Sequence, residues 1–315
     1  MADFTQVHSH GWLEFFARRG YPGVRPLAAG VEGAIYDLGD GTVAKVWGKR
    51  PVSELEAMQA FYADVAAAGL PFRTPEILTV EQIGGHAVTR ELKLPGQPLQ
   101  ARLAPDDRAP EPAAAQCIID VLRALATVPA TTAMRQLAVL DEDRAFWAGP
   151  DTFQAALLGL LDRRVRRFGD VIRSRLAGFD RTYACLQGRL AALTSSPDVV
   201  IHGDLFAGNI LADQDGHPLA VLDFGFLTTA GDARFDAAAA ANLMNMYARD
   251  ALAIARELTA KVASDLGYEP AVLLTYQAAY AVATSNAFTA DGSDGHFGWC
   301  IAQLRRDEVL TALGV

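Results

Sequence analysis

Short apolar runs separated by turn residues fill the first ninety positions of the chain and predict a small sheet. The expected strands include Ala34–Tyr36, Thr42–Trp47, Glu76–Val80 and His86–Leu92. Glycines at 39, 41, 84 and 85 lie between paired runs, an arrangement typical of β-hairpins. Helical periodicity replaces this pattern at His10–Arg19 and at Ser53–Ala68. We therefore expect three strands, a helix and two further strands, preceded by a short amphipathic helix.

Helical periodicity dominates the rest of the chain, beyond the breaking sequence Leu94-Pro95-Gly96. Helices are expected near 113–127, 150–168, 177–194, 233–246, 250–266, 270–289 and 297–313. One hairpin interrupts them, because the apolar runs Asn209–Ala212 and Leu219–Leu222 flank the turn sequence Asp213–Gly216. The pattern predicts a small sheet domain over 1–93 and a mainly helical domain over 94–315.

The composition of the 315 residues, 51% of them hydrophobic, indicates a folded protein with a substantial core. The net charge of −9 argues against nucleic acid as a partner, because phosphate binding needs a basic surface. Three widely spaced cysteines suit a reducing compartment, and no apolar leader is seen at the N-terminus. The uncharged stretch Pro270–Ala290 is too polar for a membrane span and predicts a buried helix. We expect a cytoplasmic protein without a membrane partner, and the sequence leaves its oligomeric state open.

Four polar residues gather in the hairpin segment, whose other residues are mostly apolar: His202, Asp204, Asn209 and Asp223. Pairing of the two strands would bring Asn209 and Asp223 to one end of the hairpin. An amide oxygen and a carboxylate form a hard oxygen site that suits Mg²⁺ in company with substrate phosphates. Asp204, at the start of the loop, could then accept the proton of a substrate hydroxyl. The segment therefore predicts phosphoryl transfer.

The pattern H-G-D-x-x-x-x-N followed by L-D-F-G resembles the phosphotransfer signature of protein kinases. Because glycine follows the histidine, it is more similar to the aminoglycoside phosphotransferase and choline kinase family of small-molecule kinases. The resemblance implies an α+β, protein-kinase-like bilobed fold. Its small N-terminal antiparallel sheet lobe, 1–93, would carry one helix and bind the nucleotide. Its larger, mainly helical C-terminal lobe, 94–315, would hold the catalytic loop, the metal-binding loop and the acceptor site.

The same resemblance implies roles in the first lobe. Lys45, on the third strand, would bind the nucleotide phosphates, and the loop between Gly30 and Gly33 would cover them. Glu56 would pair with Lys45, and Glu54 stays open as the alternative. The backbone of a hinge segment would bind the nucleotide base: Arg90, Glu91 and Leu92.

In the second lobe the resemblance implies a catalytic base, two metal ligands and two structural residues: Asp204; Asn209 and Asp223; His202 and Asp236. Together these residues imply ATP- or GTP-dependent, Mg²⁺-dependent transfer of a phosphoryl group to the hydroxyl of a small alcohol. No A-P-E motif follows D-F-G, so a protein substrate is not expected.

The acceptor would be an aminoglycoside-type antibiotic or, alternatively, a metabolite such as a sugar, a choline-like compound or an amino alcohol. Carboxylates without a motif role, at 141–143 and at Asp291 and Asp294, would suit a cationic acceptor. Two other interpretations stay open. One is a nucleotide-binding pseudokinase, and the other is a metal-dependent hydrolase that uses His202 and Asp204.

Overall fold

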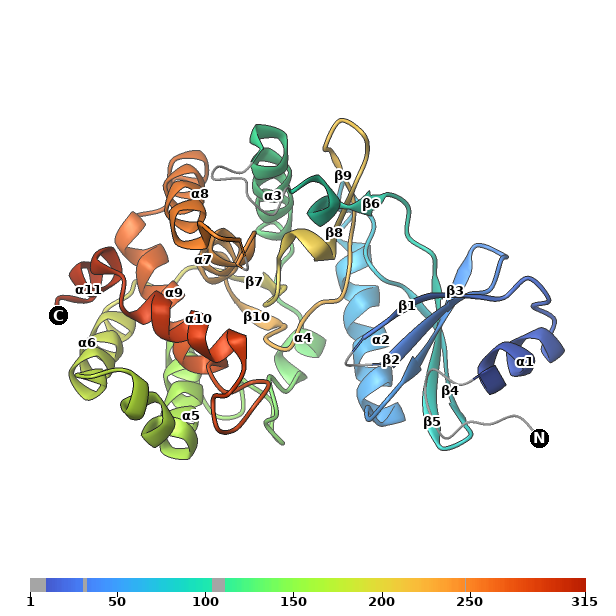
Figure 1. Cartoon of the computed structure of the whole chain (residues 1–315), viewed down its shortest axis with the longest axis horizontal. Coiled ribbons are helices and arrows are strands. Elements are labelled where there is room, and N and C mark those ends of the chain that lie inside the picture. The colour runs from blue at the N-terminus through green and yellow to red at the C-terminus, as the bar shows by residue number, and fades with distance from the viewer. Residues whose placement is uncertain (1–9, 31–32, 104–110, 247) are drawn as a thin grey trace. The chain divides into compact units, whose positions relative to one another are not determined.

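The computed structural model describes residues 10–30, 33–103, 111–246 and 248–315 (Figure 1). Contacts within the chain divide it into two compact units, which separate after Pro95. We call residues 1–95 the sheet unit and residues 96–315 the helical unit. The boundary expected from the sequence lies two residues earlier, before Leu94.

The sheet unit holds five antiparallel strands in the order β1-β2-β3-β5-β4. Their bounds are Arg25–Ala29 (β1), Gly33–Asp37 (β2), Thr42–Trp47 (β3), Ile77–Ile83 (β4) and His86–Leu92 (β5). Two helices accompany the sheet in the described part of this unit, α1 (His10–Arg18) and α2 (Val52–Ala67). The order of elements is the one that the hydrophobic pattern predicts.

Strand pairing in this unit places neighbouring residues on opposite faces of the sheet. Lys45 pairs with Thr89, and Ala44 pairs with Arg90. The apolar cluster of Ala44 includes Trp12 and Phe16 of α1, whereas Trp47 packs with Leu55 of α2. Because side chains alternate along a strand, Ala44 faces α1 and Lys45 faces the side of α2.

The helical unit begins with β6 and alternates short strands with helices. Its first elements are β6 (Gln97–Pro98), η1 (Leu99–Arg102), α3 (Pro112–Leu125), α4 (Thr132–Gln136), α5 (Phe153–Arg175) and α6 (Phe179–Ala191). The middle of the unit contains β7 (Asp198–Ile201), η2 (Ala207–Asn209), β8 (Ile210–Ala212), β9 (Pro218–Val221) and β10 (Thr229–Asp232). The last elements are α7 (Ala233–Leu243), α8 (Ala251–Leu266), α9 (Pro270–Thr284), α10 (Gly295–Leu304) and α11 (Asp307–Leu313).

Two small sheets position the loops of this unit. Strands β8 and β9 form the expected hairpin, and β6 pairs with β8 to complete a sheet of three strands. In the second sheet, β7 pairs with β10. The helix expected over 297–313 is two helices, α10 and α11, because Arg306 has an extended backbone between them. The prediction missed α4 and β10, which are only five and four residues long.

The core of the helical unit is built around α7 and α9, which pack against each other. Residues 275–284 of α9 are all buried, which confirms the expected core helix. No helix in the described ranges combines the length and apolarity that a membrane span needs. Aromatic rings of Phe153, Phe235 and Tyr276 meet edge to face at centroid distances of 5.5–6.1 Å.

Charged residues in this core and at its edge have charged or hydrogen-bonding partners. The Tyr276 hydroxyl donates a 2.7 Å hydrogen bond to Asp232, which also forms an ion pair with Arg234. Farther along, Glu308 accepts hydrogen bonds from Arg256 and Arg306. Burial alone would raise the pKa of Glu308, but the two arginines outweigh it and lower this pKa to about 2.

Candidate active site

The loop after β7 is held by a buried carboxylate of α7. Both oxygens of Asp236 accept backbone N–H groups, from His202 at 2.6 Å and from Gly203 at 2.8 Å. Burial raises the pKa of Asp236 to about 6, although these two hydrogen bonds favour its charged form. Asp236 therefore has the structural role that the family resemblance implies, because it fixes the backbone directly before Asp204.

His202 joins the two loops of the hairpin segment. Its Nδ1 accepts the backbone N–H of Asp204 at 3.2 Å, and its Nε2 donates to the carbonyl of Leu222 at 2.9 Å. This pattern requires a neutral ring with its proton on Nε2. Complete burial favours the same state, since it lowers the pKa of His202 to about 4. The ring also stacks on Phe224 at a centroid distance of 4.6 Å. His202 is thus a brace between Asp204 and the residues around Asp223.

Hairpin pairing brings Asn209 and Asp223 to the same end of β8 and β9. Ile210 pairs with Val221, and the N–H of Leu222 donates to the carbonyl of Asn209 at 2.7 Å. Asp223 follows directly, with an exposed side chain and a φ of +35°, which non-glycine residues rarely adopt. The structure therefore places these two residues on adjoining ends of the paired strands.

The donor set at this end fits a magnesium ion. The Asn209 amide nitrogen donates to the carbonyl of Asp204 at 2.9 Å, so the amide oxygen carries the remaining ligand capacity of this side chain. Asp223 adds a solvent-accessible carboxylate. Amide and carboxylate oxygens are ligands that hard divalent cations prefer, and Mg²⁺ also accepts water and phosphate.

Two glycines allow the loops to approach each other. A Cβ atom at Gly225 would lie 2.1 Å from Cβ of Asp204, and one at Gly203 would lie 2.3 Å from the carbonyl carbon of Leu227. Gly203 also has a φ of +78°, which favours glycine. Asp204 and the D-F-G segment can therefore come this close only because Gly203 and Gly225 have no side chains.

On the sheet unit, Lys45 lies in a buried polar row on the face of α2. Its Nζ is 3.8 Å from the centre of the Trp47 ring, a cation–π contact. Trp47 donates through Nε1 to the Thr89 hydroxyl at 3.0 Å, and Thr89 donates to Glu91 at 2.5 Å. The sequence prediction missed Trp47 and Thr89. Trp47 lies two residues after Lys45 on β3, and Thr89 lies two residues before Glu91 on β5, so the period of two along each strand was a usable signal.

The structure does not bring Glu56 or Glu54 to Lys45. Both glutamates are exposed on α2, and no ion pair joins either of them to another described residue. The helix turns Leu55 toward the sheet, and each successive residue is rotated by about 100° from the one before it. Glu54 and Glu56 therefore flank the buried face, and their pairing with Lys45 stays a prediction.

The predicted phosphate loop connects β1 and β2, and Gly30 and Gly33 lie at its two ends. The N–H of Gly30 donates to the carbonyl of Gly33 at 2.9 Å, which closes the loop. A Cβ atom at Gly33 would lie 2.0 Å from the carbonyl oxygen of Val46, so a larger residue does not fit there. The two residues between these glycines lie outside the described ranges.

The predicted hinge residues Arg90, Glu91 and Leu92 form the last part of β5. The backbone N–H of Leu92 donates to Glu76, and that of Lys93 donates to Gly41. These two donors are therefore engaged within the sheet unit. The side chain of Arg90 lies on the α1 face, on the other side of the sheet from Lys45.

The carboxylates expected to attract a cationic acceptor are largely engaged by neighbouring groups. Asp141 forms ion pairs with Arg164 and Arg167, and Glu142 forms one with Arg163, all at 2.5 Å. Arg164 is 2% exposed, so the ion pair that it forms with Asp141 is largely buried on the arginine side.

The second acidic loop has a local structural role. Asp294 caps the N-terminus of α10 by accepting the N–H of Phe297 at 2.8 Å, and it also binds the Thr289 hydroxyl. Asp291 accepts the N–H of Ser293 at 3.0 Å. These hydrogen bonds stabilise the loop and the helix start, and they leave less capacity for an acceptor cation.

The sequence prediction missed two phenylalanines, Phe226 and Phe288. Phe226 follows Gly225, the residue that touches Asp204, and its ring lies 6.2 Å from that of Phe288 in an edge-to-face contact. Phe288 is 55% exposed, which is unusual for a large apolar side chain. The F-G-F sequence directly after Asp223 was the available signal.

A family model described as "Phosphotransferase enzyme family" matches residues 23–284, which include Lys45, His202, Asp204, Asn209, Asp223 and Asp236. The chain belongs to this phosphotransferase family. A search of curated protein sequences gives no match.

Solved structures of phosphotransferases have the same fold. The GDP complex of aminoglycoside 2′-phosphotransferase-IIIa is 14% identical, with a TM-score of 0.59 over 92% of this chain and 97% of that one. Macrolide 2′-phosphotransferase MphH from Brachybacterium faecium is 17% identical, with a TM-score of 0.58 over 93% and 97%. Aminoglycoside phosphotransferase APH(3″)-Id from Streptomyces rimosus, with ADP and streptomycin, is 18% identical, with a TM-score of 0.51 over 84% and 94%. The protein-kinase-like α+β fold implied by the sequence is confirmed.

Proposed function

We propose that this phosphotransferase moves the γ-phosphoryl group of ATP or GTP to a hydroxyl group of a small molecule, with Mg²⁺ as cofactor. The observation that carries the proposal is the joint fixation of Asp204, Asn209 and Asp223. The brace His202 and the buried carboxylate Asp236 hold these residues through backbone contacts. Rigid placement of polar groups is what phosphoryl transfer requires, because its catalysis is mostly positioning and charge stabilisation.

Asp204 would orient the acceptor hydroxyl and take its proton. The N–H of Asp204 is held by His202, and its carbonyl is held by the Asn209 amide. The backbone of the base is therefore fixed on both sides, while its carboxylate is partly accessible. A base held in this way keeps the hydroxyl in line with the phosphoryl group, and such positioning contributes much of the rate.

Asn209 and Asp223 would hold the metal ion. When bound, Mg²⁺ neutralises negative charge that develops on the transferred group and on the leaving phosphate. Lys45, with the amides near Gly30 and Gly33, would bind the nucleotide phosphates. We assign the nucleotide base to the backbone of the hinge, Arg90–Leu92, as the family resemblance implies.

The acceptor face of the helical unit favours a molecule with an apolar surface. Phe226 follows Gly225, which lies against Asp204, and its ring contacts the exposed ring of Phe288. The carboxylates at 141, 142, 291 and 294, by contrast, serve local contacts. Aromatic rings bind the apolar faces of sugars and macrocycles by surface burial. One of the fold relatives is a macrolide phosphotransferase. We therefore propose a hydroxylated acceptor with an apolar ring face rather than a strongly cationic one.

The test is a screen of nucleotide consumption with ATP and GTP, in the presence of Mg²⁺, against macrolides, aminoglycosides, sugars and amino alcohols. Phosphorylated products are identified by a mass increase of one phosphate. Asp204→Asn should lower kcat by about 10²–10⁴-fold with nucleotide affinity retained. Asp223→Asn should remove the Mg²⁺ dependence of nucleotide binding. Asp215→Asn, the same change at the exposed tip of the same hairpin, is the matched control and should behave as the parent.

Each alternative function predicts a different result in this screen. A pseudokinase binds nucleotide without product from any acceptor. A metal-dependent hydrolase releases phosphate to water at a rate that no alcohol increases. Full activity of Asp204→Asn would contradict the role given to this residue.

A further inference from the structure

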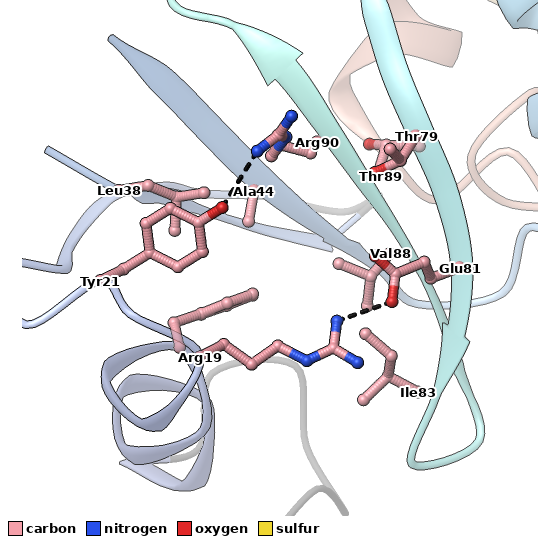
Figure 2. Close-up of a pocket in the computed structure, with 11 residues that line it drawn as sticks. Arg19, Tyr21, Leu38, Ala44, Thr79, Glu81, Ile83, Val88, Thr89 and Arg90 are labelled. Carbon is pink, nitrogen blue, oxygen red and sulfur yellow. Dashed lines mark hydrogen bonds and ion pairs between the residues drawn. The ribbon is translucent and has the colours of Figure 1, made fainter. Parts of the chain in front are cut away.

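The sheet unit contains a cavity on the face that carries α1. Its volume is about 260 Å³ (Figure 2). The apolar part of its lining comes from α1 and from four positions on or beside the strands: Phe16, Leu38, Ala44, Ile83 and Val88. Ala44 and Lys45 are neighbours on β3, so this cavity and the lysine that would bind phosphates lie on opposite faces of one sheet.

Ala44 is the smallest side chain of the cavity lining. Ala44 pairs with Arg90 of β5, and Arg90 pairs with Thr79 of β4, so these three residues form a row across the sheet. The methyl group of Ala44 leaves the centre of this row open below α1. The space is smaller than pockets of drug-sized ligands, which measure about 300–1,000 Å³. It therefore suits a molecule with a single ring or a short hydrocarbon chain.

The polar part of the cavity contains two arginines in different electrostatic situations. Arg19 forms a 2.6 Å ion pair with Glu81, so both of these charges are balanced. Arg90 donates from Nη1 to the hydroxyl of Tyr21 at 3.0 Å, and this partner is neutral. Figure 2 shows the two pairs on different sides of the cavity.

Arg90 also has an unused donor. Its Nε is buried, and among the described residues it has no hydrogen-bond partner. A buried donor without a partner costs about 1–3 kcal/mol, and more when the group is charged. Asp40 lies within electrostatic range of Arg90, but its carboxylate binds the N–H and the hydroxyl of Thr42. A carboxylate is the group that best satisfies a guanidinium in such a place.

We propose that this cavity is a binding site for a small amphipathic carboxylate, an acid with one ring or a short branched chain. The carboxylate would bind Arg90, and the hydrocarbon part would cover Ala44 and Val88. Glu81 would not repel it strongly, because Arg19 neutralises that charge. The proposal uses the side chain of Arg90, which lies on the opposite face of the sheet from Lys45, whereas the proposed function uses only the backbone of this residue.

The experiment measures binding of 3-phenylpropionate to the full chain by titration calorimetry, with the uncharged 3-phenylpropanamide as the matched ligand. We expect a Kd on the order of 0.1–1 mM for the acid, as befits a ligand of about ten heavy atoms. The amide should bind at least tenfold more weakly, because it lacks the charge that Arg90 requires. Saturating nucleotide with Mg²⁺ should leave binding of the acid in place.

Two variants of different kinds test the location. Arg90→Gln should weaken binding of the acid at least tenfold, because it removes the charge that binds the carboxylate. Ala44→Leu should abolish binding, because the larger side chain fills the cavity. Arg18→Gln, on α1 next to Arg19 but outside the cavity lining, should bind like the parent. Thermal unfolding of each variant verifies that it is folded.

Three results would overturn the proposal. Equal binding of acid and amide would exclude recognition of a carboxylate. Unchanged binding in a folded Arg90→Gln or Ala44→Leu variant would place the ligand elsewhere. Displacement of the acid by nucleotide would assign it to the nucleotide site. None of these results bears on whether the protein transfers phosphate.

Discussion

Gly225 offers a test of the catalytic geometry that leaves all chemical groups in place. Replacement by alanine would put a methyl group 2.1 Å from Cβ of Asp204. Carbon atoms in contact need about 3.5 Å, so the two segments must move apart by roughly 1.4 Å. Because a misplacement of about 1 Å costs roughly 10²-fold in rate, we expect Gly225→Ala to lower kcat by about 10²-fold or more. The overpacking should also reduce stability by about 1–3 kcal/mol.

The assay compares kcat, the KM of the nucleotide and urea unfolding for the parent and Gly225→Ala, with the acceptor found by the screen. Nucleotide affinity should change much less than kcat, because Lys45 and the Gly30–Gly33 turn belong to the sheet unit. Gly188→Ala is the control, since no atom lies within 4 Å of the added methyl group on α6. It should stabilise the protein by about 0.4–1 kcal/mol and leave kcat unchanged. A folded Gly225→Ala with kcat within twofold of the parent would refute the positioning argument.

Three further changes test other parts of the structure. Phe288→Ala should raise the acceptor KM about two- to tenfold without affecting that of the nucleotide, and equal effects on both would remove Phe288 from the acceptor site. Tyr276→Phe should lower the free energy of unfolding in urea by about 1 kcal/mol, because Asp232 loses one of its buried donors; no loss would contradict that account. Glu308→Gln tests pH dependence. The pKa of Glu308 is lowered from its ordinary value near 4.5 to about 2, so its stabilisation is present above about pH 4.5 and is lost as pH falls toward 2. The unfolding free energies of parent and variant should therefore differ most above pH 4.5 and converge near pH 2, and a constant difference would contradict the assignment.

The order of elements was predictable because local patterns determine it. Glycine turns define the hairpin of β8 and β9, and the uncharged run of α9 is buried as its composition implies. The break between α10 and α11 was not predictable from periodicity. Arg306 interrupts the helix there because its guanidinium is buried against Asn242 and Gln277 from two other helices. A contact over such sequence distances leaves no local signal.

The candidate site likewise combines features that local patterns predict with contacts between distant residues that they do not. His202, Asn209 and Asp223 lie within one hairpin segment, so spacing alone indicated that they meet. The partner of Lys45 was harder to infer, because the rotation of α2 depends on how Leu55 and Val65 pack on the sheet. The local roles of the acidic loops could not be inferred from the sequence for a related reason. Charge counts cannot show that Asp294 is occupied as a helix cap.

Helix α7 limits the substitutions that this protein can accept during evolution. Its five consecutive alanines, Ala237–Ala241, are all buried against neighbouring helices, and Asp236 beside them holds the catalytic loop. Any larger side chain among the alanines must displace a neighbouring helix. That displacement would carry Asp236, and hence the loop, with it. New acceptor preferences are therefore expected to arise by substitution at exposed positions such as Phe288. The helix that anchors the chemistry tolerates little variation.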